Sequence, residues 1–166
     1  NAAVLDCAKT VIVEINRGFV APAGGLPIDA SRIDCAFESD VPLPEMAAPQ
    51  LDDVSLKIGE RVAGLIQDGD CLQTGIGAIP AAILGQLTNK NDLGLHGGLL
   101  DGGGQALIQS GNVTGQRKAI DQGQHVTGMA LGDHGFFNWL SEASDVVFRG
   151  ANYTHDSNII GQLEQF

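Results

Sequence analysis

The sequence repeats one pattern at least three times: a short apolar or β-branched run, then a glycine-rich or polar turn, then a helical segment. The runs that read as strands cover residues 71–74, 93–96, 125–131 and 146–148. Strands that alternate with helices form crossover units, and crossover units join parallel strands. The sequence therefore predicts an α/β protein with an open, largely parallel sheet flanked by helices.

The clearest helix is predicted between residues 51 and 65. Acidic residues at 52 and 53 suit its first turn, where the helix dipole favours negative charge. Pro80 suits the first turn of a second helix. Shorter helices are expected over 105–109 and 136–140. The apolar series that predict the first two helices are Leu51, Val54, Ile58, Val62 and Leu65, and Ile83, Leu84 and Leu87.

The first 49 residues do not follow the strand–turn–helix pattern of the rest of the sequence. Residues 11–16 are β-branched and predict a buried strand, whereas 18–27 are rich in glycine and proline and predict a long loop. Residues 41–44 hold two prolines and are expected to be extended. With 44–49 they predict a linker between two lobes.

The net charge and the cysteines indicate which classes of partner and which location the sequence favours. The net charge is −11 with nine Lys and Arg, which argues against nucleic acid and anionic membrane. A small anionic ligand remains compatible, because backbone N–H groups at a helix N-terminus can hold it. No metal-ligand spacing, secretory signal or membrane span is visible. Three widely spaced cysteines, Cys7, Cys35 and Cys71, are interpreted as reduced thiols in apolar settings, and the location as cytoplasmic.

Two glycine-rich segments follow predicted strands, where ligands bind in parallel sheets. In the first, Gly75 and Gly77 precede a helix and free the backbone to direct N–H groups at a phosphate or an oxyanion. The alternative is a turn that needs glycine only for its geometry. The third glycine of the dinucleotide motif is missing.

The second segment runs from residue 97 to 104, after His96, with Asp101 five positions beyond that histidine. His96 could act as a base or orient a carbonyl group; the alternative is a core or capping histidine. His155 and Asp156 are adjacent, but neighbours on an extended segment point apart, which favours a polar loop. Gly-x-Ser-x-Gly, His-Glu-x-x-His and Walker motifs are absent.

The run DGDCLQTGIGAIP at residues 68–80 resembles the DGDTLQxGIGxIPxA stretch of the acetyl-CoA hydrolase/CoA-transferase family. LGLH at 93–96, VIVEIN at 11–16 and YTHD at 153–156 resemble further segments of it in the same order. The resemblance implies a NagB/RpiA-like, two-lobed CoA-transferase fold. Residues 1–49 would end the N-terminal lobe and hold the linker, and 50–166 would begin an incomplete C-terminal lobe. It also implies that both ends of the chain are cut.

The resemblance further implies an acyl-CoA substrate, a carboxylate acceptor, no covalently bound cofactor and a homodimer. CoA-binding residues would be Gly75, Ile76, Gly77, Ala78, Gly97 and Gly98. One position departs from the family. Its nucleophilic glutamate, which forms an acyl anhydride and then a glutamyl-CoA thioester, aligns without gaps with Gly98. A glycine cannot serve as that nucleophile.

Three mechanisms remain. Water could attack the thioester, activated by His96 or Asp101, with the Gly75–Gly77 loop polarising the carbonyl group. Another carboxylate, Asp101 or one beyond this chain, could replace the glutamate. Alternatively, the protein binds CoA esters without turning them over. Hydrolysis is the preferred hypothesis and the non-catalytic binder the second; a sugar-phosphate isomerase of related topology rests on fold analogy alone.

Overall fold

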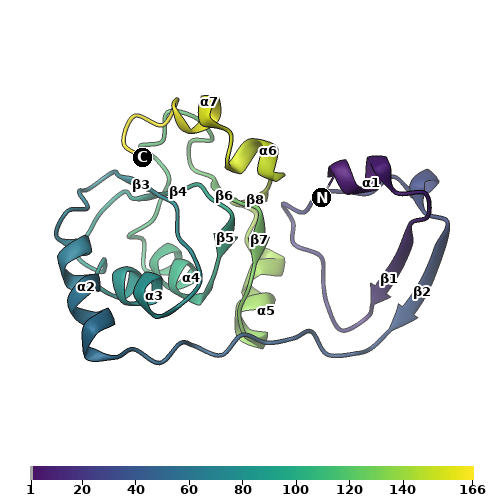
Figure 1. The fold of residues 1–166 in the computed structure, drawn as a ribbon, viewed down its shortest axis with the longest axis horizontal. Coiled ribbons are helices and arrows are strands. Elements are labelled where there is room, and N and C mark those ends of the chain that lie inside the picture. The colour runs from purple at the N-terminus through teal and green to yellow at the C-terminus, as the bar shows by residue number, and fades with distance from the viewer. Residues whose placement is uncertain (1) are drawn as a thin grey trace.

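A computed structural model describes residues 2–166 of the chain (Figure 1). Two of the parallel strand pairs in its larger part are β3 (Cys71–Leu72) with β4 (Gly94–Leu95), and β6 (His125–Thr127) with β8 (Val146–Phe148). A parallel bridge between His96 and Val126 joins β4 to β6. The predicted strands and their parallel arrangement are therefore confirmed, in the order β3, β4, β6, β8.

One loop prediction and one strand prediction are wrong in part. The predicted glycine loop over 97–104 contains a strand, β5 (Leu99–Leu100), and its last glycines form the first turn of α4 (Gly102–Gln109). Asp101 makes this early start possible, because its side chain caps the helix. The third predicted strand is divided at Gly128 into β6 and β7 (Met129–Ala130), and β7 pairs with β5.

The helix predicted from 51 to 65 is confirmed as α2 (Asp53–Ala63), with Asp52 as its N-cap. The apolar series is not its buried face, since Leu65 is 78% exposed. Small residues at four-residue steps are buried instead, and they face α3 (Ala78–Gly85). A Cβ at Gly59 would lie 2.7 Å from the backbone carbon of Ala82. The two helices thus approach closely because their contact lacks large side chains.

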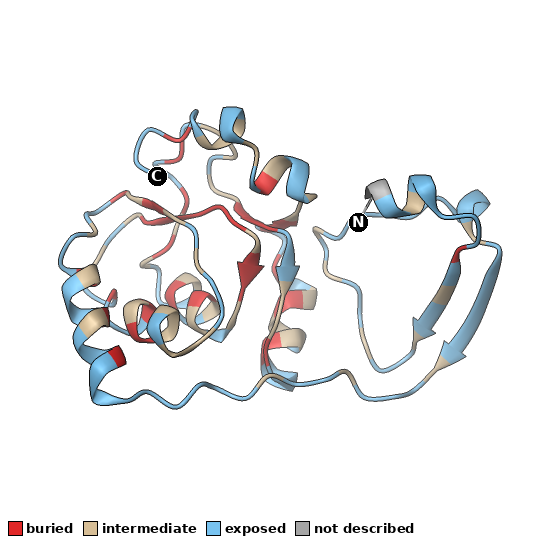
Figure 2. Cartoon of the chain, in the orientation of Figure 1, coloured by how far each residue is buried: buried red, intermediate tan, exposed pale blue. Residues whose placement is uncertain are grey.

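One hydrophobic core lies beneath the short strands, between them and helices α2 to α5 (Figure 2). The predicted helix at 136–140 is confirmed as α5 (His134–Glu142), capped by Asp133. Two single-turn helices follow β8: α6 (Ala151–Thr154) and α7 (Ser157–Ile160). The core residues are Ala63, Leu84, Leu87, Leu93, Leu95, Leu100, Leu107, Val113, Phe136, Leu140, Ala143 and Val146.

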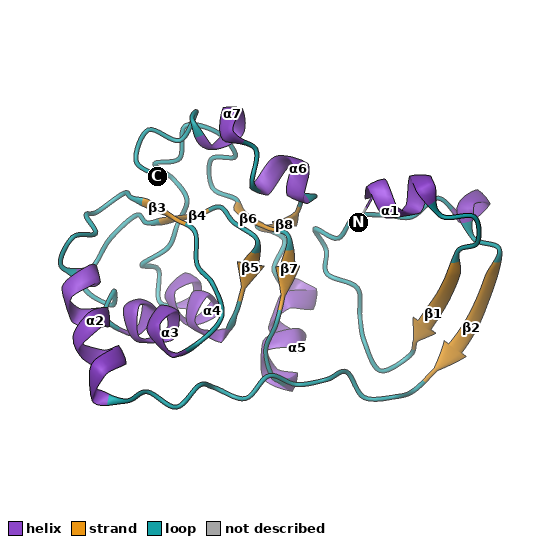
Figure 3. Cartoon of the chain, in the orientation of Figure 1, coloured by secondary structure: helices purple, strands orange, loops and turns teal. Residues whose placement is uncertain are grey.

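Residues 2–39 form a separate group of elements, seen on the right of Figure 3. It contains α1 (Ala2–Cys7), a 3-10 turn (Ala30–Arg32) and a parallel pair, β1 (Ile12–Asn16) and β2 (Cys35–Ser39). The predicted strand exists, but the prediction that it is buried is wrong: Ile12 is 63% exposed. Cys7 and Cys35 are exposed too, so only Cys71 has the apolar setting expected of all three.

An extended stretch without helix or strand, residues 40–52, leads from β2 to α2. The loop between β1 and β2 also contacts the larger part of the chain. The backbone N–H of Phe148, in β8, donates to the Gly24 carbonyl over 3.0 Å, and the rings of Phe19 and Phe137 meet edge to face at 5.7 Å. Among residues 2–166, no helix has the length and apolar character needed to cross a membrane.

Candidate functional site

The carboxyl ends of β3 and β4 bring the two glycine-rich segments to one edge. The strands pair in register, Leu72 opposite Leu95, so the residues that follow them leave the sheet side by side. The Gln73 side chain lies on Gly97, where a Cβ would come within 2.9 Å of Gln73 Cγ. The glycine at 97 therefore leaves room for Gln73 at the edge where parallel sheets bind ligands.

The first glycine segment is open on its outer side. Gly77 has φ 124° and ψ −175°, a conformation that residues with a Cβ rarely adopt, and it begins α3 without a side-chain cap. Ile76 is 63% exposed. Gly75 lines a cavity of about 480 Å³ whose other walls come from α2, α3, Gln73, Thr74 and Phe166. The helix N-terminus thus offers uncapped N–H groups beside an apolar cavity.

His96 is fully buried at the end of β4. Neither ring nitrogen has a hydrogen-bond partner among the residues that the structure describes. Its ring lies 5.7 Å from that of Tyr153 and 6.3 Å from that of Phe166. Burial, and then the positive charge of Lys118, lower the pKa of His96, which keeps the imidazole neutral. His96 does not line the cavity beside Gly75.

Asp101 has a structural task at the other end of β5. Its Oδ1 accepts a hydrogen bond from the Gly104 backbone N–H at 3.0 Å, as the N-cap of α4. It lines a different cavity, of about 410 Å³, with Gly102, Gly103 and Met46 among its neighbours. The structure thus does not place His96 and Asp101 in one shared cavity, and their catalytic roles stay predictions.

Gly98 has a neighbour that sequence reasoning missed. A Cβ at Gly98 would lie 2.7 Å from His155 Cε1 and 3.1 Å from His155 Nε2. His155 follows α6, and its Nε2 lies 3.1 Å from Gln73 Nε2. Asp156 does not orient this imidazole; it caps α7 by accepting from Asn158 N at 2.8 Å. The adjacency of His155 and Asp156 drew attention to a pair that the structure does not form. The position of His155 soon after the last strand was the signal that could have placed it near this edge.

A buried cation lies beneath the same edge. Lys118 Nζ donates to the Leu95 carbonyl over 3.3 Å and to the Gln124 carbonyl over 2.8 Å. Burial lowers the pKa of Lys118 and raises the pKa of the neighbouring Cys71 thiol to about 11. Cys71 is therefore a protonated thiol, and Lys118 ties β4 to the loop before β6.

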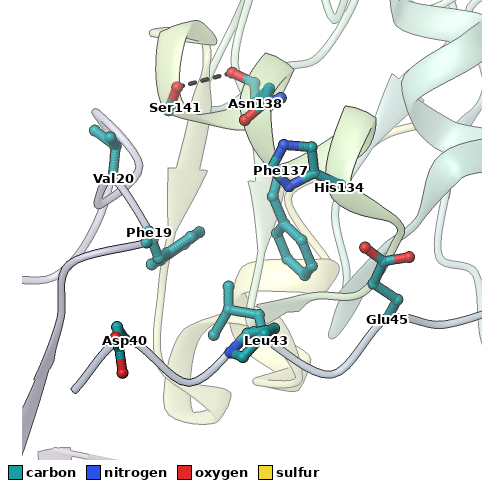
Figure 4. Close-up of a pocket in the computed structure, with 11 residues that line it drawn as sticks. Phe19, Val20, Asp40, Leu43, Glu45, His134, Phe137, Asn138 and Ser141 are labelled. Carbon is teal, nitrogen blue, oxygen red and sulfur yellow. Dashed lines mark hydrogen bonds between the residues drawn. The ribbon is translucent and has the colours of Figure 1, made fainter.

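A cavity of about 290 Å³ lies away from this edge, between the 18–20 and 40–45 segments and α5 (Figure 4). In the close-up, Phe19 and Phe137 form one wall, and the Ser141 hydroxyl donates to the Asn138 carbonyl at 2.7 Å. The His134 ring lies beside Phe137, and Glu45 lies on the side of Phe137 away from Phe19. Its lining includes none of the predicted site residues.

Parallel strands, crossover helices and glycine-rich turns at the carboxyl edge define a protein of the open α/β class, in which ligands bind at that edge. No family model matches the sequence. The chain is 34% identical to the 4-hydroxybutyrate coenzyme A transferase of Clostridium kluyveri, over 93% of the chain and 36% of that protein. It is 33% identical to the succinyl-CoA:cyclohexane-1-carboxylate CoA transferase of Geobacter metallireducens, with the same coverage.

A solved 4-hydroxybutyrate CoA-transferase from Porphyromonas gingivalis superposes with a TM-score of 0.91 and 29% identity, over 99% of the chain and 42% of that structure. By sequence and by fold, the chain is similar to CoA-transferases, which confirms the resemblance carried by residues 68–80. It spans about a third of the length of the curated relatives it matches.

Proposed function

We propose that the chain contributes a thioester-binding edge to an enzyme that acts on acyl-CoA. The observation that carries the proposal is the parallel register of β3 and β4, which sets Gln73 against Gly97 beside the uncapped start of α3. The first-turn N–H groups of α3 would stabilise negative charge on a phosphate or on the attacked carbonyl oxygen. The names of the relatives, all CoA-transferases, support the same substrate class.

Hydrolysis is the reaction we propose, with water in place of a carboxylate nucleophile. Gly98 aligns with the glutamate that the transferase route requires, and a glycine offers no atom to form the covalent intermediate. CoA transfer to a carboxylate acceptor, the activity after which the relatives are named, would need a nucleophile from elsewhere in the protein. A cytoplasmic location and a homodimer remain predictions.

Thiol release from acetyl-, butyryl- and succinyl-CoA by the full-length protein tests the proposal. Hydrolysis gives free thiol at a rate independent of added acetate. Transfer gives acetyl-CoA from butyryl- or succinyl-CoA only when acetate is present, without net thiol. Binding of acyl-CoA without either product would favour the non-catalytic alternative and reject the hydrolase.

The Gly98→Glu substitution tests whether the site lacks only its nucleophile or differs from a transferase site in other ways too. The new side chain would meet His155, so the substitution is made alone and together with His155→Ala. If only the carboxylate is missing, the double variant forms a covalent CoA adduct, seen by mass spectrometry, and gains transfer to acetate. Unchanged protein mass in both variants counts against a site that lacks only its nucleophile.

A further inference from the structure

An apolar cavity of about 500 Å³ lies between the loop that joins β1 to β2 and the larger part of the chain. Leu26 and Ile28 line it from the loop, and Ala130 and Phe148 line it from β7 and β8. Its volume is in the range of cavities that bind small molecules. The residues that line the cavity of Figure 4 include two carboxylates, whereas this cavity has apolar walls.

The loop is held against the sheet at Gly24. The Phe148 backbone N–H donates to the Gly24 carbonyl over 3.0 Å. A Cβ at Gly24 would lie 2.9 Å from Val147 Cα, so the loop backbone approaches β8 as closely as a glycine allows. Nearer the start of the loop, the ring of Phe19 packs against that of Phe137. Contacts at two points thus fix the wall that the loop gives to the cavity.

Gly128 connects the cavity to the carboxyl edge of β4. It lines the cavity, and a Cβ there would lie 3.2 Å from the Gly98 carbonyl oxygen and 3.5 Å from Gly98 Cα. The Met129 backbone N–H donates to the same carbonyl over 2.9 Å. One residue without a side chain therefore separates the cavity from the position that aligns with the nucleophile of the transferases. A thioester attacked beside Gly98 would have its acyl group within reach of the cavity.

The lining offers no partner to a charged acyl group. Among the residues that the structure describes, no polar side chain lines the cavity. Arg149 follows Phe148, but its Nη1 donates to the Phe148 carbonyl at 3.0 Å and it is not a lining residue. Leu26 and Ile28 are 57% and 45% exposed, so an apolar occupant would remove their surface from water. A carboxylate in the same place would lose hydration without gaining a hydrogen bond.

We infer that this cavity holds the acyl chain of the substrate. The enzyme then selects apolar acyl groups, such as butyryl and hexanoyl, over acyl groups that end in a carboxylate, such as succinyl. Leu26, Ile28 and Phe148 are its specificity-determining residues. The inference rests on the proposed acyl-CoA activity and names the class of acyl group for the same site.

The first test compares acetyl-, butyryl-, hexanoyl- and succinyl-CoA with the full-length protein. Butyryl and succinyl groups differ only at the far end, which is a methyl group in one and a carboxylate in the other. The readouts are kcat/KM for loss of the acyl-CoA, with and without acetate, and dissociation constants from isothermal titration calorimetry, which need no turnover.

We expect kcat/KM for butyryl-CoA to exceed that for succinyl-CoA about 100-fold or more, because the cavity leaves a buried carboxylate unpaired. Butyryl-CoA should exceed acetyl-CoA about tenfold, since each methylene removed from water adds about fourfold. Hexanoyl-CoA should be used at least as well as butyryl-CoA. The dissociation constants should follow the same order.

The second test places a cation in the lining with Ile28→Arg. Val20→Arg is the matched control, because Val20 lies in the same loop, is 68% exposed and does not line this cavity. We expect Ile28→Arg to raise kcat/KM for succinyl-CoA and lower it for butyryl-CoA, so that their ratio changes about 30-fold or more. Val20→Arg keeps the wild-type ratio. Circular dichroism verifies folding, and a folding defect would lower both values and could not raise the one for succinyl-CoA.

Each outcome decides between the two proposals. Equal or better use of succinyl-CoA by the wild-type protein would overturn the acyl cavity and leave acyl-CoA hydrolysis standing. An unchanged ratio in folded Ile28→Arg would mean that another segment of the full-length protein covers the cavity, which also overturns the inference. If no ester is turned over, hydrolysis is rejected. In that case tighter binding of butyryl-CoA than of succinyl-CoA still supports the acyl cavity, and equal binding rejects it.

Discussion

The chain contains two groups of parallel strands that differ in what covers them. β6 is buried along its length and β8 at Val146 and Val147, because helices pack against them. β1 is as rich in β-branched residues as β6 and β8, and it pairs with β2 over five residues, yet Ile12 in β1 and Phe37 in β2 are 63% and 51% exposed. A two-stranded sheet without a second layer buries little apolar surface. Composition thus predicts β1, β6 and β8 as strands but not β2, and neighbouring elements determine which of them are buried.

The largest effect is expected for a substitution in the buried core. Leu87→Ala removes a side chain that is 0% exposed in the core beneath β4. We expect the free energy of unfolding to fall by about 3 kcal/mol, from lost transfer energy and the cavity left behind. Urea unfolding of the full-length protein measures it. A loss below about 1 kcal/mol would mean that this core relaxes as freely as the β1–β2 sheet.

Gly59→Val tests the close contact of α2 with α3. The Cβ would lie 2.7 Å from a backbone carbon of Ala82, and backbone cannot rotate away, so we expect a loss of about 2 kcal/mol. Gly85→Ala is the matched control, since a Cβ there meets nothing within 4 Å. The control should be neutral or slightly stabilising. Equal destabilisation by both substitutions would show that the close contact with Ala82 does not account for the loss at Gly59.

Acid should weaken the buried strands first. Burial lowers the pKa of His96 and of His125, so the folded state binds fewer protons than the unfolded state. Stability is therefore expected to fall as the pH drops below about 6.5, the value for an unfolded histidine. The hydrogen bond from Ser55 lowers the pKa of Asp52, and its stabilisation is lost only in a more acidic window, below about 3.8.

Urea midpoints at pH 7.5 and pH 5.5 measure this effect. The wild-type midpoint should be lower at pH 5.5, and His125→Gln should reduce the difference. The Asp145 carboxylate, 3.4 Å from His125 Nε2, opposes the burial effect. Identical wild-type midpoints at the two pH values would show that this pairing cancels the cost of charging a buried ring.

The carboxyl edge shows how far sequence reasoning reached. Strands at 71–74 and 93–96 and the turn at Gly77 were predictable, because a β-branched or apolar run and a glycine before a proline are local signals. The neighbours of Gly98 were not, since Gln73 and His155 are 82 positions apart and meet only through the fold. Asp101 was predicted to activate water or to replace the glutamate, but its capping bond, which depends on where α4 begins, was not predicted.

The smallest effect is expected for a substitution on the exposed strand β1. Ile12→Thr replaces a β-branched residue that is 63% exposed on β1 by another with similar strand propensity. We expect the free energy of unfolding to change by less than about 0.5 kcal/mol, as for surface substitutions in general. The same urea unfolding experiment as for Leu87→Ala measures it, so the two variants give a direct ratio. A loss approaching that of Leu87→Ala would reveal that Ile12 is covered in the full-length protein, by a layer beyond the described residues.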